Sequence, residues 1–283
     1  HKEYRRQRQM CIRDSLKVLG KRPDGYHDLR SLVCPVSVFD RLQISECGEG
    51  FRFSCSDAAL PLDGGNLVVR AARLFCEREG IASKFEIRLE KGIPHGAGLG
   101  GGSSDAAAVL EGLNRILERG LSVEVLSDMA AELGSDVPLF LRRGAVWISG
   151  RGERVEPAVL PRDWSLVLVK PGFGVSTPWA YGALAAARAE VGLDDAETDI
   201  GGVILANDLE RPVFRKYLLL AEIKRWFAAQ EGCLGALMSG SGSTVFGVFD
   251  ADLDAGRCST AFTREFGPEF WVREARTMGC LGG

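Results

Sequence analysis

Alternating apolar and polar residues along the chain predict a series of half-buried strands. In residues 84–90 (KFEIRLE), Phe85, Ile87 and Leu89 fall on one face and charged side chains fall on the other. This alternation is typical of a sheet with one face in water. Further strands are predicted at 16–19, 30–46, 51–55, near 145–149 and at 164–169.

A different spacing, with apolar residues three and four positions apart, predicts helices between these strands. The most regular one begins near residue 103 or 104, and its buried face is formed by Ala106, Val109, Leu110, Leu113 and Leu117. Asn66 predicts the start of a helix over 66–79, and Ser122 predicts the start of another over 123–133. Two more helical regions are predicted at 178–190 and around 201–228.

Two segments interrupt this pattern and predict the domain organisation. Residues 1–15 (HKEYRRQRQMCIRDS) lack apolar periodicity, so we expect a tail that is foreign to the fold or disordered. The charged, proline-containing segment around 151–163 predicts a boundary between two domains, at 16–162 and 163–283. The mixture of strands and helices on both sides of this boundary predicts an α+β fold.

Composition narrows the classes of function. The chain has 283 residues with a net charge of -3, so we expect no broadly basic surface and no nucleic-acid partner. No apolar run approaches the roughly 20 residues that a membrane crossing needs, so we expect no membrane partner. The eight cysteines include no Cys-x-x-Cys pair and only three histidines occur. We therefore expect reduced thiols, no zinc site and a cytoplasmic location.

The strongest chemical signal is PHGAGLGGGSSDAAA, which begins at Pro94. Glycine occupies five of the seven positions 96–102, and it lets backbone N–H groups approach a ligand without a Cβ in the way. Because a predicted helix follows directly, these amides and the helix N-terminus favour an anion, above all a phosphate. Ser103 and Ser104 add hydroxyls for a phosphate oxygen or a magnesium ion. A flexible turn is the alternative, but a turn needs only one or two glycines.

Two common phosphate loops do not fit this stretch. A Walker A loop ends in Gly-Lys-Ser/Thr, and no lysine is present here. Gly96, Gly98 and Gly101 satisfy G-x-G-x-x-G, but the preceding strand alternates instead of being continuously apolar. The acidic residue expected about 20 positions later would also lie in a predicted helix. Dinucleotide binding is therefore disfavoured.

GLGGGSSDAAAVL resembles the signature of the GHMP kinases, the superfamily of galactokinase, homoserine kinase and mevalonate kinase. Within it, LKVLGKRPDGYHDL, LGSDVPLFL, PGFGVSTPWAY and MSGSGSTVFG are similar to a branch whose alcohol substrate carries a cytidine diphosphate group. The resemblance runs from about Leu16 to Phe249. A homoserine or mevalonate type of kinase is the alternative, and the DGYH stretch argues against it.

The resemblance implies a two-domain GHMP kinase fold, with an N-terminal ATP-binding α/β domain, a C-terminal ferredoxin-like domain and substrate in the cleft between them. It implies ATP and Mg²⁺, with a small-molecule substrate as the partner; we expect a monomer or a homodimer. The ATP-binding residues that it implies are Asn66, Pro94, His95, Gly96, Ala97, Gly98, Leu99, Gly100, Gly101, Gly102, Ser103 and Ser104. The sequence names no protein ligand for the metal beyond a serine.

Asp136, in LGSDVP, is the candidate catalytic residue. A carboxylate can orient an acceptor hydroxyl and take its proton. From the residues alone a helix N-cap is equally good, because Asp before Val-Pro suits a helix start. The resemblance favours catalysis.

The resemblance also implies four substrate-binding residues. Tyr26 would stack on the cytidine base and His27 would hydrogen-bond to it, whereas the pair by itself is more typical of surface or core. Thr177 and Tyr181 would lie near the substrate, with core packing as the competing interpretation for Tyr181. The second glycine-serine loop, residues 238–247, would back the active site from the second domain; by itself it is equally typical of a hairpin or βα turn.

The chain departs from the family pattern at its start. The family has an Ala-Lys-x-Asn-Leu strand before the stretch that begins at Leu16, and its lysine and asparagine fall on Cys11 and Arg13 here. Cys11 does not replace the lysine chemically, because it is neutral and short, and Arg13 does not replace the asparagine, because it cannot accept a hydrogen bond as an amide does. Foreign sequence over a lost strand is one account, and a catalytically impaired nucleotide-binding homologue is the other. We expect ATP binding with poor phosphate transfer.

Overall fold

The computed structural model of the chain describes residues 3–13, 15–22, 27–142, 144–187, 197–252 and 255–278. Its contacts form two compact units, each built from several stretches of the sequence. Unit 1 comprises residues 1–10, 38–95 and 100–143, and unit 2 comprises residues 11–37, 96–99 and 144–283. Both units mix helices and strands, as the α+β prediction requires. The predicted division of the sequence at residue 162 stays a prediction.

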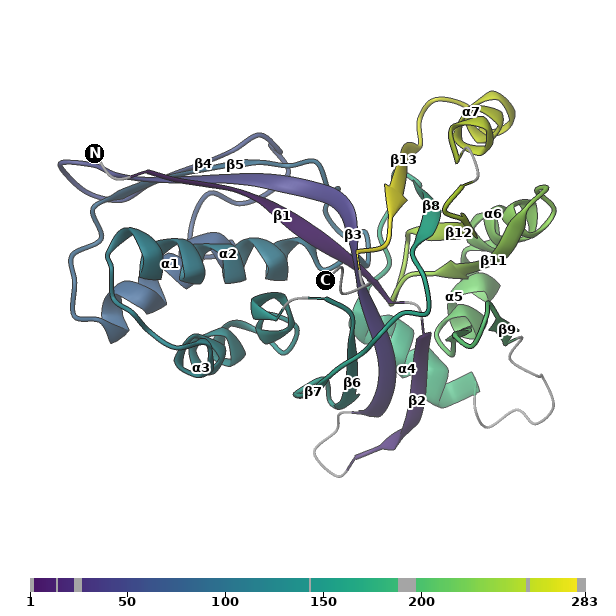
Figure 1. Cartoon of the computed structure of the whole chain (residues 1–283), viewed down its shortest axis with the longest axis horizontal. Coiled ribbons are helices and arrows are strands. Elements are labelled where there is room, and N and C mark those ends of the chain that lie inside the picture. Colours follow the sequence, from purple (N-terminus) through teal and green to yellow (C-terminus); the bar gives the residue numbers. More distant parts are fainter. Residues whose placement is uncertain are drawn as a thin grey trace. The chain divides into compact units, whose positions relative to one another are not determined.

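Unit 1 packs helices against a small sheet (Figure 1). Its elements are the second half of β3 (His27–Glu46), β4 (Arg52–Cys55), α1 (Leu67–Arg78), β5 (Phe85–Glu90), α2 (Gly101–Ile116), α3 (Val123–Leu133) and the 3-10 helix η1 (Pro138–Leu141). Strand β5 pairs in parallel with β4 and antiparallel with β3, where Arg41 lies opposite Glu90. The alternating residues Phe85, Ile87 and Leu89 are buried in the core with the helices, which confirms the predicted half-buried strand.

The helix ends in unit 1 follow the capping signals with one exception. The Asn66 side chain accepts from the Val68 amide and starts α1, and the Ser122 side chain accepts from the Val125 amide and starts α3, as predicted. Helix α2 begins at Gly101 instead of Ser103 or Ser104. Its N-cap is Gly100, which has a left-handed φ of 70° and no side chain to form a cap bond. The serines therefore lie inside the first turn.

Unit 2 contains strands of two sheets, and those of the first sheet come from distant parts of the sequence. The first half of β3 pairs with β2 (Ser15–Lys21) on one side and with β6 (Val146–Gly150) on the other. Strand β6 also pairs with β7 (Arg154–Pro157). Beyond β2, the sheet continues through β10 (Ile204–Asn207) to β9 (Thr198–Asp199). The helical prediction for 201–228 is wrong at its start, where β10 precedes α5 (Glu210–Lys216) and α6 (Leu218–Ala228). Strand β10 has four residues, which are too few to show a clear alternation of apolar and polar positions, and it is held by pairing with β2.

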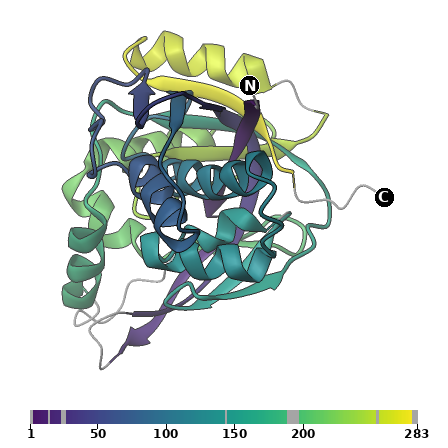
Figure 2. The same cartoon turned by 90° about the vertical axis from the view of Figure 1, so that its left-hand side faces the viewer.

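The second set of strands in unit 2 forms the ferredoxin-like part. Its antiparallel order is β11 (Cys233–Met238), β12 (Val245–Asp250), β8 (Trp164–Lys170) and β13 (Trp271–Arg276). Every residue of β8 is buried, as expected for a central strand covered on both faces. Helix α7 (Ala255–Phe266) packs against β13, and the two run side by side in Figure 2. Helix α4 (Thr177–Ala187) completes the unit.

Strand β1 (Glu3–Arg13) lies within residues 1–15, where a tail that is foreign to the fold or disordered was expected. It pairs with β3, and Tyr4 and Ile12 are buried. The Tyr4 ring occupies the space that Gly112 leaves on α2, because an added Cβ there would lie 2.9 Å from Tyr4 Cδ1. Strand pairing and the burial of Tyr4 and Ile12 support this strand, so the lack of apolar periodicity did not exclude ordered structure. That the segment is foreign sequence stays a prediction.

Two general features concern the whole described chain. No helix in the described ranges has both the length and the apolar character that crossing a membrane requires. The cysteines in those ranges, Cys11, Cys34, Cys47, Cys55, Cys76, Cys233 and Cys258, are all free thiols.

Candidate active site

The glycine-rich segment has backbone angles that other residues rarely adopt. Gly96, Gly98 and Gly100 have φ of 66°, 72° and 70°, all in the left-handed region. Because Gly100 offers no cap hydrogen bond, the first amides of α2 lack an acceptor from a capping side chain. The positive end of the helix macrodipole then suits an external anion.

In unit 1, Gly100 and Gly101 leave little room for side chains. An added Cβ at Gly100 would lie 2.5 Å from Phe140 Cζ, and one at Gly101 would lie 3.0 Å from Ile93 Cγ2. The predicted residues Pro94 and His95 belong to the same unit, as do Gly102, Ser103 and Ser104. Ser104 is buried and Ser103 is half-buried, so Ser103 presents the more accessible hydroxyl.

In unit 2, residues Gly96–Leu99 contact the second glycine-serine loop. The Thr244 amide donates to Ala97 O at 3.2 Å, and Ser239 Oγ donates to Gly98 O at 3.1 Å. An added Cβ at Gly98 would lie 2.5 Å from Ser239 O and 2.7 Å from Gly242 O. The two glycine loops that the sequence singled out therefore pack backbone to backbone.

Asp136 lies in the turn between α3 and η1 in unit 1 and is half-buried. The residue at the N-cap of η1 is Val137, and no side-chain hydrogen bond caps that helix. The N-cap alternative for Asp136 therefore finds no support. Helix η1 packs against α2, and its Phe140 ring faces Gly100, so the turn with Asp136 and the start of α2 belong to one packed region.

The predicted ATP-binding residue Asn66 has a structural role in unit 1. Its Oδ1 accepts from the Val68 amide at 2.9 Å, and its Nδ2 donates to Pro61 O at 3.0 Å. The side chain is buried, and the α1 residue next to it, Leu67, lies 3.7 Å from where a Cβ of Gly102 would stand. Asn66 thus fixes the start of α1 beside the start of α2, and its contact with ATP stays a prediction.

Unit 2 brings together three of the four predicted substrate residues in two contacts. The His27 and Tyr181 rings are stacked with centroids 5.5 Å apart and an interplanar angle of 27°. The hydroxyls of Thr177 and Ser241 are 2.8 Å apart, so the start of α4 is bonded to the second glycine loop. Tyr26 lies outside the described residues.

Residues that the sequence did not single out hold the second loop in place. Asn207, at the end of β10, donates from Nδ2 to Met238 O and to Gly240 O, both at 2.7 Å. Its Oδ1 accepts from the Leu209 amide at 2.9 Å. A buried asparagine at the end of a strand could have indicated this role, but the strand itself was not predicted.

The segment that departs from the family pattern also reaches this loop. The Arg13 amide donates to Ser239 Oγ at 3.3 Å, and Arg13 Cδ lies 3.6 Å from where a Cβ of Gly240 would stand. Cys11 is half-buried in the same strand. Position 13 is therefore close to the loop that contacts Gly98.

A buried ion cluster in unit 1 was also missed. Lys91 pairs with Asp40 and Asp105, and all three side chains are nearly inaccessible. Burial raises the pKa of Asp105 to about 7, with Lys91 opposing the shift. Burial lowers the pKa of Lys91, but the two carboxylates outweigh it and the net change is upward. These residues are far apart in the sequence and form no local motif.

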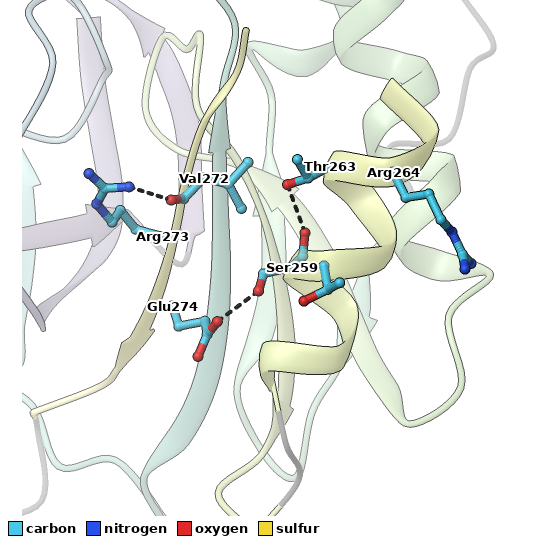
Figure 3. A pocket seen from close by; sticks show the side chains of 7 residues that line it. Ser259, Thr263, Arg264, Val272, Arg273 and Glu274 are labelled. Atoms are coloured by element: carbon cyan, nitrogen blue, oxygen red, sulfur yellow. Dashed lines mark hydrogen bonds between the residues drawn. The ribbon is translucent and has the colours of Figure 1, made fainter. Parts of the chain in front are cut away.

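A polar groove lies between α7 and β13 in unit 2 (Figure 3). Across it, Ser259 Oγ donates to Glu274 Oε1 at 2.7 Å. Its lining residues are Ser259, Thr260, Thr263, Arg264, Val272, Arg273 and Glu274. None of them is a predicted site residue, so this groove is separate from the candidate active site.

Comparison with known families identifies both halves of the chain. The model of the GHMP kinases N terminal domain matches residues 66–144, and the GHMP kinases C terminal model matches residues 197–269. A 4-diphosphocytidyl-2-C-methyl-D-erythritol kinase from Methylacidiphilum infernorum (isolate V4) is 44% identical over 242 residues, which cover 84% of this chain and 83% of the relative. A protein of the same name from Syntrophotalea carbinolica (strain DSM 2380 / NBRC 103641 / GraBd1) is 44% identical over 250 residues, covering 86% and 88%.

Solved structures agree with these relatives. A crystal structure of 4-(cytidine 5'-diphospho)-2C-methyl-D-erythritol kinase matches with a TM-score of 0.80 and 35% identity, covering 98% of this chain and 100% of that one. The L. major mevalonate kinase in complex with R-mevalonate matches with a TM-score of 0.71 at 13% identity, covering 98% and 96%, and shares the fold alone. By sequence and by fold, the chain belongs to the GHMP kinases, in the family of the 4-diphosphocytidyl-2-C-methyl-D-erythritol kinases.

Proposed function

We propose that this chain transfers the terminal phosphate of ATP to the 2-hydroxyl of 4-diphosphocytidyl-2-C-methyl-D-erythritol, giving the 2-phosphate and ADP. Its family makes it an ATP-dependent small-molecule kinase. The proposed reaction is a step of non-mevalonate isoprenoid precursor synthesis and takes place in the cytoplasm. The acceptor is proposed from the names of the relatives and from the DGYH stretch.

The observation that carries the proposal is the backbone of the glycine-rich segment. Three glycines with left-handed φ lead directly into α2, whose N-terminus has no side-chain cap. A helix N-terminus without a side-chain cap, at the positive end of the macrodipole, suits the triphosphate of ATP. Pro94–Ser104 would hold the phosphates.

Asp136 is the proposed catalytic residue. Its carboxylate takes the proton of the acceptor hydroxyl while that oxygen bonds to the γ-phosphorus of ATP. The bond from the γ-phosphorus to the bridging oxygen breaks, and ADP leaves with the electron pair. A half-buried position in a turn packed between α3 and α2 would hold the carboxylate in a fixed orientation.

Unit 2 carries the residues proposed for the cytidine base. The stacked rings of His27 and Tyr181 offer a flat surface and a hydrogen-bonding nitrogen, and Tyr26 precedes them in the chain. Aromatic faces favour a nucleobase through stacking. Thr177, bonded to Ser241, would orient the substrate beside this surface.

A divalent metal accompanies ATP in kinases, and we propose Mg²⁺. The described residues contain no group of three or more His, Cys, Asp or Glu side chains that could hold a metal ion. Mg²⁺ needs few protein ligands because it keeps water molecules and binds phosphate oxygens. The Ser103 hydroxyl is a hard oxygen donor that fits it. When bound, the ion neutralises charge on the β- and γ-phosphates.

A second candidate function is nucleotide binding with little phosphate transfer. Cys11 and Arg13 occupy the positions where the resemblance expects a lysine and an asparagine. The contact of the Arg13 amide with Ser239 places this difference next to the loop that packs on Gly98. A missing ammonium near transferring phosphate lowers the rate more than it lowers binding.

The test is ADP production with 4-diphosphocytidyl-2-C-methyl-D-erythritol, homoserine and mevalonate as acceptors. We expect ADP with the first acceptor only, and Asp136→Asn to lower kcat by about 10²–10⁴-fold. The matched control is Asp128→Asn, which makes the same change at an exposed position of α3 and should leave kcat unchanged. ATP binding by calorimetry without ADP production would favour the second candidate. Failure to bind ATP would contradict both.

A further inference from the structure

An ion cluster next to the first turn of α2 has no role in the chemistry proposed above. Lys91 Nζ donates to Asp105 Oδ2 at 2.9 Å and also to Asp40 Oδ2. The side chains of Lys91, Asp40 and Asp105 are 7%, 1% and 2% exposed. We propose that Lys91 is a positioning residue, whose ion pairs with Asp40 and Asp105 fix the two ends of the glycine-rich segment and so set its geometry for the phosphates of ATP.

Asp40 fixes the end at which the chain enters the segment. Its Oδ1 accepts from the Gly92 amide at 2.8 Å and from the Ile93 amide at 3.0 Å. These two residues directly precede Pro94. The other carboxylate oxygen of Asp40 accepts from Lys91, so one side chain on β3 holds three consecutive residues.

Asp105 fixes the end at which the chain leaves the segment. It lies in the first turns of α2, directly after Ser103 and Ser104. The cluster also touches the helix backbone, because an added Cβ at Gly101 would lie 3.4 Å from Lys91 Nζ and 3.6 Å from Asp40 Oδ2. Lys91 therefore links the residues before the segment to those after it.

The surroundings of Lys91 favour positioning over direct contact with ATP. Its side chain is 7% exposed, and two of its three N–H groups are bonded to carboxylates. Within the described residues, Asp105 Oδ1 accepts no hydrogen bond, so Lys91 provides the bond that orients this carboxylate. Removing the lysine would leave two carboxylates buried together without a cation.

The first experiment compares Lys91→Met with Lys84→Met. Methionine keeps most of the apolar stem of Lys91 and removes its charge, while Lys84 is an exposed lysine just before β5. Titration calorimetry should show ATP binding weakened about tenfold or more in Lys91→Met, because small displacements of a binding segment are costly. Lys84→Met should bind ATP like the wild type. Wild-type affinity in a folded Lys91→Met protein would overturn the inference.

The second experiment separates positioning from stability. In Lys91→Met/Asp105→Asn, one buried carboxylate becomes neutral, so thermal stability should return toward the wild type while ATP affinity stays reduced about tenfold. Recovery of both would mean that the cluster serves stability alone. If Lys91→Met does not fold, the ATP affinity of the double variant is compared with that of the wild type instead. The inference rests on the proposed function, and failure of the wild type to bind ATP would refute that function instead.

Discussion

Gly98 combines a left-handed φ with backbone atoms packed where its Cβ would stand. Gly80 has a left-handed φ of 61°, but a Cβ there would meet nothing within 4 Å. Gly98 has a φ of 72°, and a Cβ would also stand 2.5 Å from Ser239 O and 2.7 Å from Gly242 O. Its side chain is therefore excluded both by the backbone conformation and by the packing of the two glycine loops.

We expect Gly98→Ala to lower kcat/KM for ATP by about 10²-fold, because the loop must shift to make room for the methyl group. Steady-state ADP production measures the effect. Gly48→Ala is the control, since a Cβ there has no neighbour within 4 Å and the position lies outside both glycine loops. A Gly98→Ala enzyme with wild-type kinetics would show that this close packing is not needed for ATP use.

Single residues differ in how far sequence can assign them. The high density of glycines at 96–102 predicts a phosphate-binding loop, and Asn66 and Ser122 predict helix starts. For Asp136 the spacing alone left two interpretations, and the structure removes the cap because Val137 takes that position. Lys91 and its partners on β3 and α2 form no local pattern, so only the folded chain reveals their cluster.

At the scale of elements, β1 is where sequence and structure differ most. Its sequence lacks a periodic apolar face, yet the structure pairs it with β3 and buries Tyr4 and Ile12. Strand β10 was missed for a related reason, because four residues depend on pairing with β2. By contrast, β5 and α1 carry their own periodicity and caps, and both were predicted.

Restoring the family pattern at residues 10–14 should raise turnover. The substitutions Met10→Ala, Cys11→Lys, Arg13→Asn and Asp14→Leu recreate Ala-Lys-x-Asn-Leu. A new ammonium that offsets phosphate charge should increase kcat by roughly 10²–10³-fold, measured as ADP production with the cytidine-diphospho substrate. The same set with Cys11→Met in place of Cys11→Lys is the control without the added charge. Equal rates in the repaired and original chains would contradict this account of β1.

At the scale of the whole molecule, ligand binding should raise thermal stability. ATP with Mg²⁺ at 100 times its Kd stabilises the folded state by about 2.7 kcal/mol if it binds only that state. For a chain of this size the increase in Tm should be roughly 4–5 °C by scanning calorimetry. Chelating the metal with EDTA should remove most of the increase, and MgCl₂ alone should not produce it. An equal increase in EDTA would show that ATP binds without the metal.

The overall class was predictable, whereas the assignment of segments to units was not. Mixed strand and helix patterns indicated α+β, and the glycine motifs indicated the kinase family. That residues 11–37 and 96–99 belong with residues 144–283 depends on contacts between segments far apart in the sequence. Local sequence patterns do not indicate which distant segments come into contact.

The division into two units has a spectroscopic consequence. The five tryptophans of the chain all belong to unit 2: Trp147, Trp164, Trp179, Trp226 and Trp271. Indole emission during denaturation therefore reports on unit 2 alone, while far-ultraviolet circular dichroism also registers α1, α2 and α3 of unit 1. Chains with more than one unit need not unfold in a single step. If the fluorescence and circular dichroism curves do not coincide, their order shows which unit unfolds first, without any added label.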